Sequence, residues 1–174
     1  NKILSINQIS DSAYTTPKIL AIDIETYYSP DSKKIVPEQN PILMIALYAP
    51  ELKKVLTWRK FETKDQTIEF HNNEAEMITT ACNLIKEYQP DILAGYFSDG
   101  FDLPYIKTRA EKNNIPLTFT PEGSTLRISG RTSTMAEING LLHVDVFKFI
   151  RNVMARNMET DSLSLDAVST ELLG

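Results

Sequence analysis

The sequence predicts a single α/β domain with a mixed β-sheet, and three observations lead to this prediction. The chain has 174 residues, which is the size of one domain. Apolar runs typical of strands alternate with amphipathic stretches typical of helices, and two of the runs are close enough to form a hairpin. Hydrophobic residues make up 42% and charged residues 24%, a globular composition that excludes a disordered tail or a disulfide scaffold.

The first predicted elements are three strands. Residues 18–26 are nearly continuously apolar, which is typical of a central strand buried on both faces. Prolines and polar residues indicate a loop over 27–40. Two more apolar runs, 42–48 and 54–58, are separated by a turn at Pro50, and this spacing predicts a hairpin.

The best-marked helix is predicted to start at Asn73. Glu76 follows three residues later, as in a capping box, and apolar residues then recur at three- and four-residue spacing up to Tyr88. Pro90 ends the helix. The remaining elements follow in the order strand, helix, four strands and two helices. Their expected ranges are 91–96, 103–113, 117–120, 125–129, 135–138, 141–146, 147–155 and 164–173.

Domain organisation and cellular setting follow from the composition. Residues 1–17 are polar and indicate a lead-in segment, and the absence of a repeat or linker predicts one domain over 18–174. Cys82 is the only cysteine, which fits a reducing compartment, so we expect a cytoplasmic protein. No apolar run approaches the roughly 20 residues of a membrane helix, so no membrane partner is expected.

The formal net charge of −5 narrows the possible functions. A module that binds nucleic acid mainly through its phosphates is expected to be basic, so the charge argues against one. An acidic chain is compatible with an enzyme whose carboxylates hold metal ions, because the metals then supply the positive charge.

Asp23 and Glu25 are the first candidate site residues. Alternation along a strand puts them on one face, with Ile22 and Ile24 on the other, and separates them by roughly 6.6 Å. Two adjacent carboxylates repel each other, so either one is protonated or a cation such as Mg²⁺ lies between them. The alternative is that the strand ends at Ile22 and both acids are solvated.

Asp102 lies where the predicted strand 91–96 leads into the helix 103–113, a position at which α/β sheets place ligands. Taken alone, Asp102 is better explained as the N-cap of the helix. His143 and Asp145 share a strand face, and we favour a structural pair in which Asp145 accepts hydrogen bonds.

Three further residues are given structural interpretations. We expect His71 to be solvated just before the helix, and Cys82 to be a small buried hydrophobic residue. Trp58 ends a strand and is better explained by packing than by base stacking.

Four blocks of the sequence resemble the exonuclease region of family B DNA polymerases of the archaeal type. Residues 19–26 resemble the first exonuclease motif, and 96–102 with the following helix resemble the second. Residues 140–151 and 164–168 resemble the stretches that follow in the same order. The resemblance covers residues 18–174, and its two key aspartates, Asp23 and Asp102, are 79 positions apart.

The resemblance implies a ribonuclease-H-like fold and 3′→5′ proofreading by hydrolysis of the terminal phosphodiester. It implies that Asp23, Glu25 and Asp102 hold two Mg²⁺ or Mn²⁺ ions. The expected partners are the 3′ end of single-stranded DNA and the remaining domains of a polymerase. The residues implied in contact with the terminal nucleotides are Thr26, Tyr27, Phe97 and Phe101.

Two departures from the family pattern affect these expectations. Phe97 stands where the family usually has an Asn that contacts the single strand. The third motif, Tyr-x-x-x-Asp, has only one match, from Tyr27 to Asp31, which is in the wrong place and is attributed to chance. We therefore expect a domain that stops before its last helix and supplies three of the four carboxylates.

Two other functions remain open from the sequence. A catalytically silent domain could serve as a structural scaffold that lines a DNA channel of the polymerase. A different nuclease of the same fold could act on RNA or without a polymerase, although the blocks after residue 140 argue against it.

Overall fold

The structure is a computed structural model, and it describes residues 16–28, 34–130 and 133–174. The predicted lead-in segment, apart from its last two residues, lies outside the described residues, as does Asp31. Within the described part of the chain, no helix is long and apolar enough to span a membrane.

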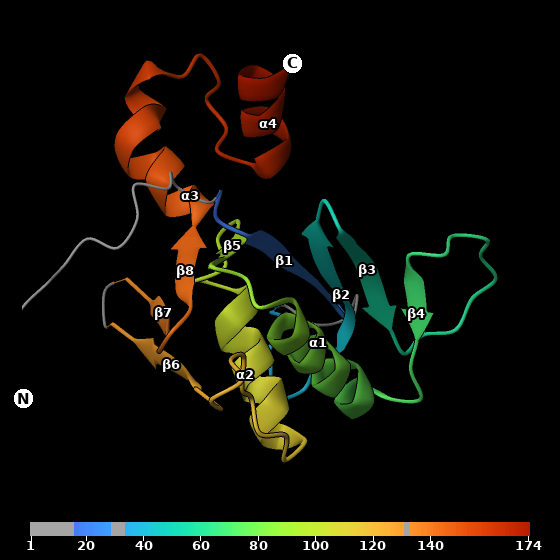
Figure 1. Ribbon diagram of the computed structural model, residues 1–174. Coiled ribbons are helices and arrows are strands. Elements are labelled where there is room, and N and C mark those ends of the chain that lie inside the picture. Colours follow the sequence, from blue (N-terminus) through green and yellow to red (C-terminus); the bar gives the residue numbers. More distant parts are fainter. Residues whose placement is uncertain (1–15, 29–33, 131–132) are drawn as a thin grey trace, which may run out of the picture.

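The molecule is built around a six-stranded mixed sheet in the order β4-β3-β2-β1-β5-β8, which confirms the predicted fold class (Figure 1). β1 pairs antiparallel with β2 and parallel with β5, and β5 pairs parallel with β8. A separate two-stranded sheet joins β6 and β7. The strands are β1 (Ile19–Thr26), β2 (Ile42–Ala49), β3 (Leu52–Thr57), β4 (Ile68–Phe70), β5 (Ile92–Gly95), β6 (Leu126–Ser129), β7 (Met135–Ile138) and β8 (Leu142–Asp145).

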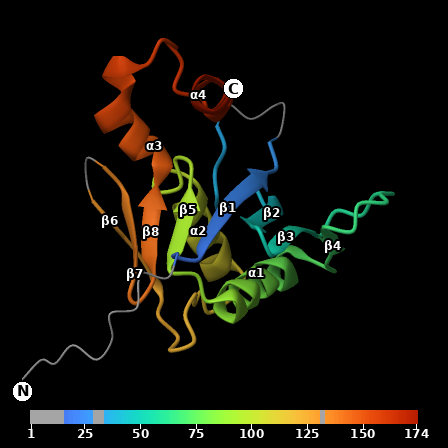
Figure 2. The ribbon, with the colours of Figure 1, turned by 45° about the horizontal axis from the view of Figure 1, so that its top comes forward.

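Helices cover one face of the sheet and one end of it. Figures 1 and 2 show α1 (Glu74–Tyr88) and α2 (Asp102–Lys112) together on one face. The third helical segment continues from β8 as α3 (Val146–Phe149), a π-helical turn over Ile150–Met154 and a 3₁₀ turn over Ala155–Asn157. The last helix is α4 (Leu165–Leu173).

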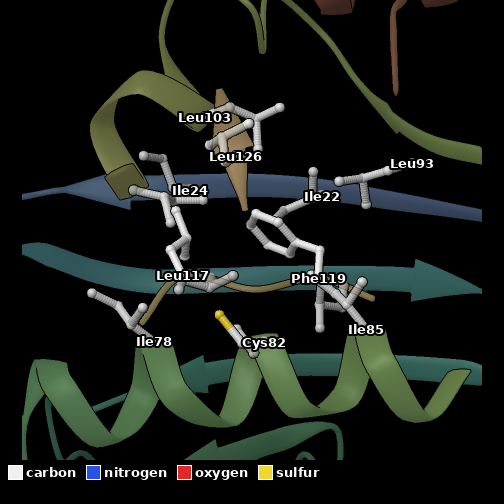
Figure 3. Packing of buried hydrophobic residues seen from close by; sticks show 14 of the residues in the cluster. Ile22, Ile24, Ile78, Cys82, Ile85, Leu93, Leu103, Leu117, Phe119 and Leu126 are labelled. Carbon is white, nitrogen blue, oxygen red and sulfur yellow. The ribbon is translucent and has the colours of Figure 1, made fainter. Parts of the chain in front are cut away.

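The core lies between the sheet and α1 (Figure 3). Ile22 and Ile24 of β1 belong to the same buried cluster as Ile78 and Ile85 of α1. Each such side chain contributes roughly 1.5–3 kcal/mol through removal from water. Cys82 lies in the same layer and is buried, as predicted.

The start of α1 confirms the predicted capping residue. Asn73 is the N-cap, and its side-chain oxygen accepts a hydrogen bond from the backbone N–H of Glu76 at 2.9 Å. The Glu76 carboxylate returns to the backbone N–H of Asn72 at 2.9 Å, one residue earlier than in a capping box.

A buried ion pair fastens α1 to α2. The Glu74 carboxylate of α1 accepts hydrogen bonds from the Arg109 guanidinium of α2 at 2.8 and 2.5 Å. It also accepts the backbone N–H of Ile42 in β2 at 2.8 Å. One carboxylate therefore connects both helices to the sheet, and it holds α2 through Arg109 in the last turn of that helix.

The structure corrects two expectations near the edge of the sheet. The prediction of a solvated His71 is wrong, because His71 is 5% exposed and its backbone N–H bonds to the Thr57 carbonyl at 2.8 Å. It directly follows β4, a strand of three residues that the sequence pattern did not reveal. Trp58 is half-buried and donates to the Ile42 carbonyl at 2.6 Å, which confirms its packing role.

The predicted strand over 117–120 is also wrong. The segment makes only an isolated bridge between Thr118 and Thr125. Leu117 and Phe119 are buried in the core and occupy the space between the sheet and α1 in Figure 3. The alternation of apolar and polar residues over 117–120 therefore reflects packing of two side chains against the sheet, and the segment is not one of its strands.

Candidate active site

Asp23 and Glu25 lie on the exposed side of β1. The burial of the strand alternates there: Ile22 and Ile24 face the core, whereas the two acids do not. The strand continues to Thr26, so the alternative in which it ends at Ile22 is wrong. Both carboxylates are thus presented together on the face opposite the core.

Asp102 is not the N-cap of α2. Phe101 occupies the cap position without a side-chain cap hydrogen bond, and Asp102 is the first residue of the helix. Its carboxylate oxygen Oδ1 accepts the backbone N–H of Ile24 in β1 at 3.0 Å, and the residue is only 3% exposed. The cap interpretation is therefore wrong, and Asp102 instead joins α2 to the strand that carries Asp23.

The sheet geometry explains this contact. β5 pairs with β1 only as far as Ala94 opposite Ala21, and the chain then leaves the sheet. Beyond Ala21, the edge of β1 that faced β5 has no neighbouring strand, so the Ile24 N–H needs another acceptor. Asp102 supplies it, and the same contact places its carboxylate close to Asp23.

The electrostatics of the two aspartates are strongly perturbed. Burial, reinforced by the negative charge of Asp23, raises the pKa of Asp102 to about 7, although the Ile24 hydrogen bond opposes the shift. Partial burial of the carboxyl group also raises the pKa of Asp23, although the residue as a whole is exposed. Such a pair favours either a shared proton or a bound cation.

The structure brings Asp23 and Asp102 together but does not add a third acid to them. Across residues 16–28, 34–130 and 133–174, no group of three His, Cys, Asp or Glu side chains is placed to hold a metal ion. Glu25, on the same side of β1, is thus outside the pair. Mg²⁺ commonly binds proteins through one or two carboxylates together with waters and substrate phosphates, and a pair suits that mode.

The residues implied in substrate contact surround the end of β1 and the start of α2. Thr26 ends β1 next to a register shift, and the Tyr27 backbone N–H is already bonded to the Pro41 carbonyl at 2.9 Å. The Tyr27 side chain is exposed. Phe101 is half-buried, with its ring 5.3 Å from that of Tyr105. Phe97 is exposed.

Asp145 holds the loop that leads to Asp102. Its Oδ1 accepts the backbone N–H groups of Phe97 at 2.9 Å and Phe147 at 3.0 Å. Its Oδ2 accepts the backbone N–H of Asp99 at 3.2 Å. This confirms that Asp145 accepts structural hydrogen bonds, here from the backbone.

His143 pairs with that loop and not with Asp145. Its Nε2 lies 2.9 Å from the Ser98 hydroxyl and its Nδ1 lies 3.3 Å from the Asp99 carboxylate. Burial lowers the pKa of His143, which favours the neutral ring. This order of contacts is that of a Ser-His-Asp triad, but Ser98 is fully buried, so the trio shapes the loop and offers no nucleophile to a substrate.

Asp99 also holds this loop, a contribution that the sequence pattern does not indicate. Its Oδ1 accepts the backbone N–H of Ala136 at 2.6 Å, and its Oδ2 forms an ion pair with Lys148 at 2.5 Å. These two interactions connect the loop between β5 and α2 to β7 and α3. Because these partners are 37 and 49 positions away, no local pattern could have revealed them.

Comparisons with known proteins identify the family of this chain. Residues 2–168 match the family described as "DNA polymerase family B, exonuclease domain". The chain is 35% identical over 158 residues to a DNA polymerase of Pyrococcus glycovorans, covering 90% of this chain and 19% of that protein. It is 33% identical over 162 residues to a DNA polymerase of Thermococcus litoralis, covering 90% of this chain and 9% of that protein.

A solved structure supports the fold. The family B DNA polymerase of the archaeon Pyrobaculum calidifontis aligns with a TM-score of 0.62 and 24% identity, over 83% of this chain and 17% of that one. The mixed sheet with flanking helices agrees with a ribonuclease-H-like fold. The chain spans a fifth or less of the polymerases that it matches. It belongs to the archaeal-type exonuclease domain of family B DNA polymerases.

Proposed function

We propose that this chain removes nucleotides from the 3′ end of single-stranded or frayed DNA by metal-dependent hydrolysis, as part of a DNA polymerase. One observation carries the proposal. The Asp102 carboxylate, bonded to the backbone of β1, lies beside Asp23 at the end of a central strand. Membership of the exonuclease family supplies the reaction class.

The chemistry of the donors fits a divalent cation. Asp23 and Asp102 offer hard carboxylate oxygens, and Asp102 is buried next to a like charge, an arrangement that a bound cation stabilises. Asp23 and Asp102 would hold Mg²⁺ or Mn²⁺, and Glu25 would join them from the same side of β1; two ions are expected in the complete site. Such ions activate water and stabilise the leaving oxygen of a phosphodiester.

The chain's own residues would bind and orient the strand. Thr26 and the exposed Tyr27 side chain lie at the end of β1, and Phe101 precedes Asp102 directly. An aromatic ring next to the acids suits a terminal base, because stacking tolerates every base. A site of this kind accepts a single strand, so mismatched ends, which fray more readily, would be the preferred substrates.

A silent scaffold is the second candidate. It is favoured by the lack of a three-residue metal-binding group within the described ranges, and by Phe97 in place of the family's usual Asn. In that case the domain would line a DNA channel of the polymerase without cutting.

Cleavage of 5′-labelled single-stranded DNA in Mg²⁺, and then in Mn²⁺, tests the proposal. We expect stepwise shortening from the 3′ end that disappears in Asp23→Ala and in Asp102→Asn. Asp65→Asn is the matched control, because Asp65 is exposed in the loop between β3 and β4 and its carboxylate accepts hydrogen bonds from Thr67. The same assay with RNA of equal sequence tests the alternative nuclease.

Binding of Mn²⁺, followed by electron paramagnetic resonance, separates the two candidates. Metal binding that depends on Asp23 supports the catalytic site even if turnover is slow. The absence of both shortening and Asp23-dependent Mn²⁺ binding would leave the scaffold as the function.

A further inference from the structure

We propose that Phe97, Phe147 and Arg151 form a base-stacking subsite for single-stranded DNA, beside the acids of the candidate active site. The proposal rests on the proposed function for the identity of the ligand. It assigns a ligand-binding role to two residues of α3 and its continuation, Phe147 and Arg151, for which the sequence resemblance implies no contact with DNA.

Phe97 is held in a conformation that large side chains rarely adopt. Its φ is +61°, in the left-handed region, and its side chain is 47% exposed. Its N–H donates to Asp145 at 2.9 Å, and its carbonyl accepts the N–H groups of Gly100 and Phe101, each at 3.0 Å. These bonds maintain the backbone conformation, which keeps the ring at the surface just before α2.

The Phe97 ring has neighbours on two sides. The ring of Phe147 lies 5.2 Å from it, at an interplanar angle of 83°. On another side lies Gly100, where a Cβ atom would be only 2.5 Å from the Phe97 ring. The absence of a side chain at Gly100 is therefore what allows the ring to occupy this place.

A cation completes the arrangement. The Arg151 guanidinium lies over the Phe147 ring, 5.4 Å from its centroid. Phe147 and Arg151 are four positions apart, so the helical turn brings them onto one face. Lys148 lies between them in sequence but forms an ion pair with Asp99 at 2.5 Å, so its charge is partly neutralised.

These side chains line one surface cavity of about 250 Å³, which Ser133 and Thr134 also border. Aromatic faces suit a nucleobase, and a guanidinium suits the adjacent phosphate. The Arg151 guanidinium adds a positive charge beside the exposed Phe97 ring and the half-buried Phe147 ring, which favours a polyanion. The Phe97 carbonyl accepts the N–H of Phe101, the residue directly before Asp102, so a base stacked here would belong to a nucleotide near the 3′ end.

Fluorescence anisotropy with a 5′-fluorescein single-stranded oligonucleotide tests the subsite, in the absence of divalent metal so that no cleavage occurs. Phe97→Ala and Phe147→Leu should each weaken binding by about 5-fold to about 100-fold, the loss of one stacked base. Gly100→Ala retains both rings but displaces that of Phe97, and should weaken binding in the same way. Phe149→Leu is the control, because Phe149 is 53% exposed on the same helix but outside the cavity.

An abasic scan identifies stacking as the cause. Oligonucleotides with one abasic residue at successive positions from the 3′ end are compared between wild type and Phe97→Ala. At one position the missing base should weaken wild-type binding while the effect of Phe97→Ala disappears. Thermal unfolding of each variant identifies any loss of fold, and Gly100→Ala then carries the test if Phe97→Ala does not fold.

Wild-type affinity in Phe97→Ala, Phe147→Leu and Gly100→Ala would overturn the subsite. So would an equal effect of Phe97→Ala on every abasic oligonucleotide. Binding that depends on Phe97 in a protein that shows no metal-dependent cleavage would support the subsite and refute the nuclease function. Cleavage that depends on Asp102, with a KM unchanged in Phe97→Ala, would refute the subsite and leave the nuclease standing.

Discussion

Replacing Asp102 by Asn should stabilise the metal-free protein at neutral and alkaline pH while it abolishes the proposed cleavage. Asn is nearly isosteric, and its side-chain oxygen can still accept the Ile24 N–H that Asp102 accepts at 3.0 Å. The substitution removes only the charge that burial and Asp23 make unfavourable. A buried acid next to a like charge lowers stability, and the fold tolerates it.

The magnitude follows from the pKa of Asp102, which is raised from 3.8 to about 7. Between pH 3.8 and about pH 7, the Asp102 carboxyl is protonated in the native protein and ionised in the unfolded chain. The contribution of Asp102 to the free energy of unfolding is therefore fully present below about pH 4, and is lost as pH rises through about 7. The difference corresponds to an upper limit of about 4 kcal/mol.

Urea unfolding in the presence of a chelator, from about pH 4 to about pH 8, measures the effect. Asp102→Asn and wild type should have similar stability near pH 4 and diverge as the pH rises, whereas Asp161→Asn, at an exposed aspartate, should follow wild type throughout. A difference that does not change with pH would refute the reasoning. Addition of Mg²⁺ near pH 8 should then stabilise wild type and leave Asp102→Asn unchanged, by linkage of binding to folding.

Three other substitutions test the contacts that position the site. Arg109→Met leaves the Glu74 carboxylate buried without its partner and should cost about 3–5 kcal/mol in urea unfolding; a loss under about 1 kcal/mol would contradict this. Asp145→Ala removes three backbone hydrogen bonds and should speed amide exchange at Phe97, measured by mass spectrometry; unchanged exchange would show that the loop is held elsewhere. Asn73→Ala removes the cap of α1 and should cost about 1 kcal/mol by thermal unfolding.

Local patterns predicted most of the elements that position the site. The apolar run that ends in Asp23 and Glu25 is β1, with the acids on the face opposite the core. The capping residue Asn73 starts α1 where the sequence placed it. Predictions failed where a segment was short or packed under the sheet, as at β4 and at residues 117–120. Three residues carry too little periodicity to show a strand.

The contacts of Asp102 could not be predicted from local pattern. Taken alone, the sequence favours Asp102 as a helix cap because Asp is common there, while the family resemblance implies a metal ligand, which stays a prediction. In the structure, the Asp102 carboxylate accepts the backbone N–H of Ile24 in β1, which lies 78 positions earlier in the chain. The expected contribution of Glu25 remains a prediction that the metal-binding experiment tests.

The sequence alone determined which residues could take part: a strand with acids on one face, an aspartate before a helix, and an aromatic at position 97. These are properties of short segments, because strand alternation and helix periodicity are local. Only the tertiary structure decided that Asp102 bonds to β1, that its pKa rises to about 7, and that Phe97 faces solvent beside Phe147. The reason is the sheet register, because β5 leaves β1 after Ala94 and exposes the edge that Asp102 fills.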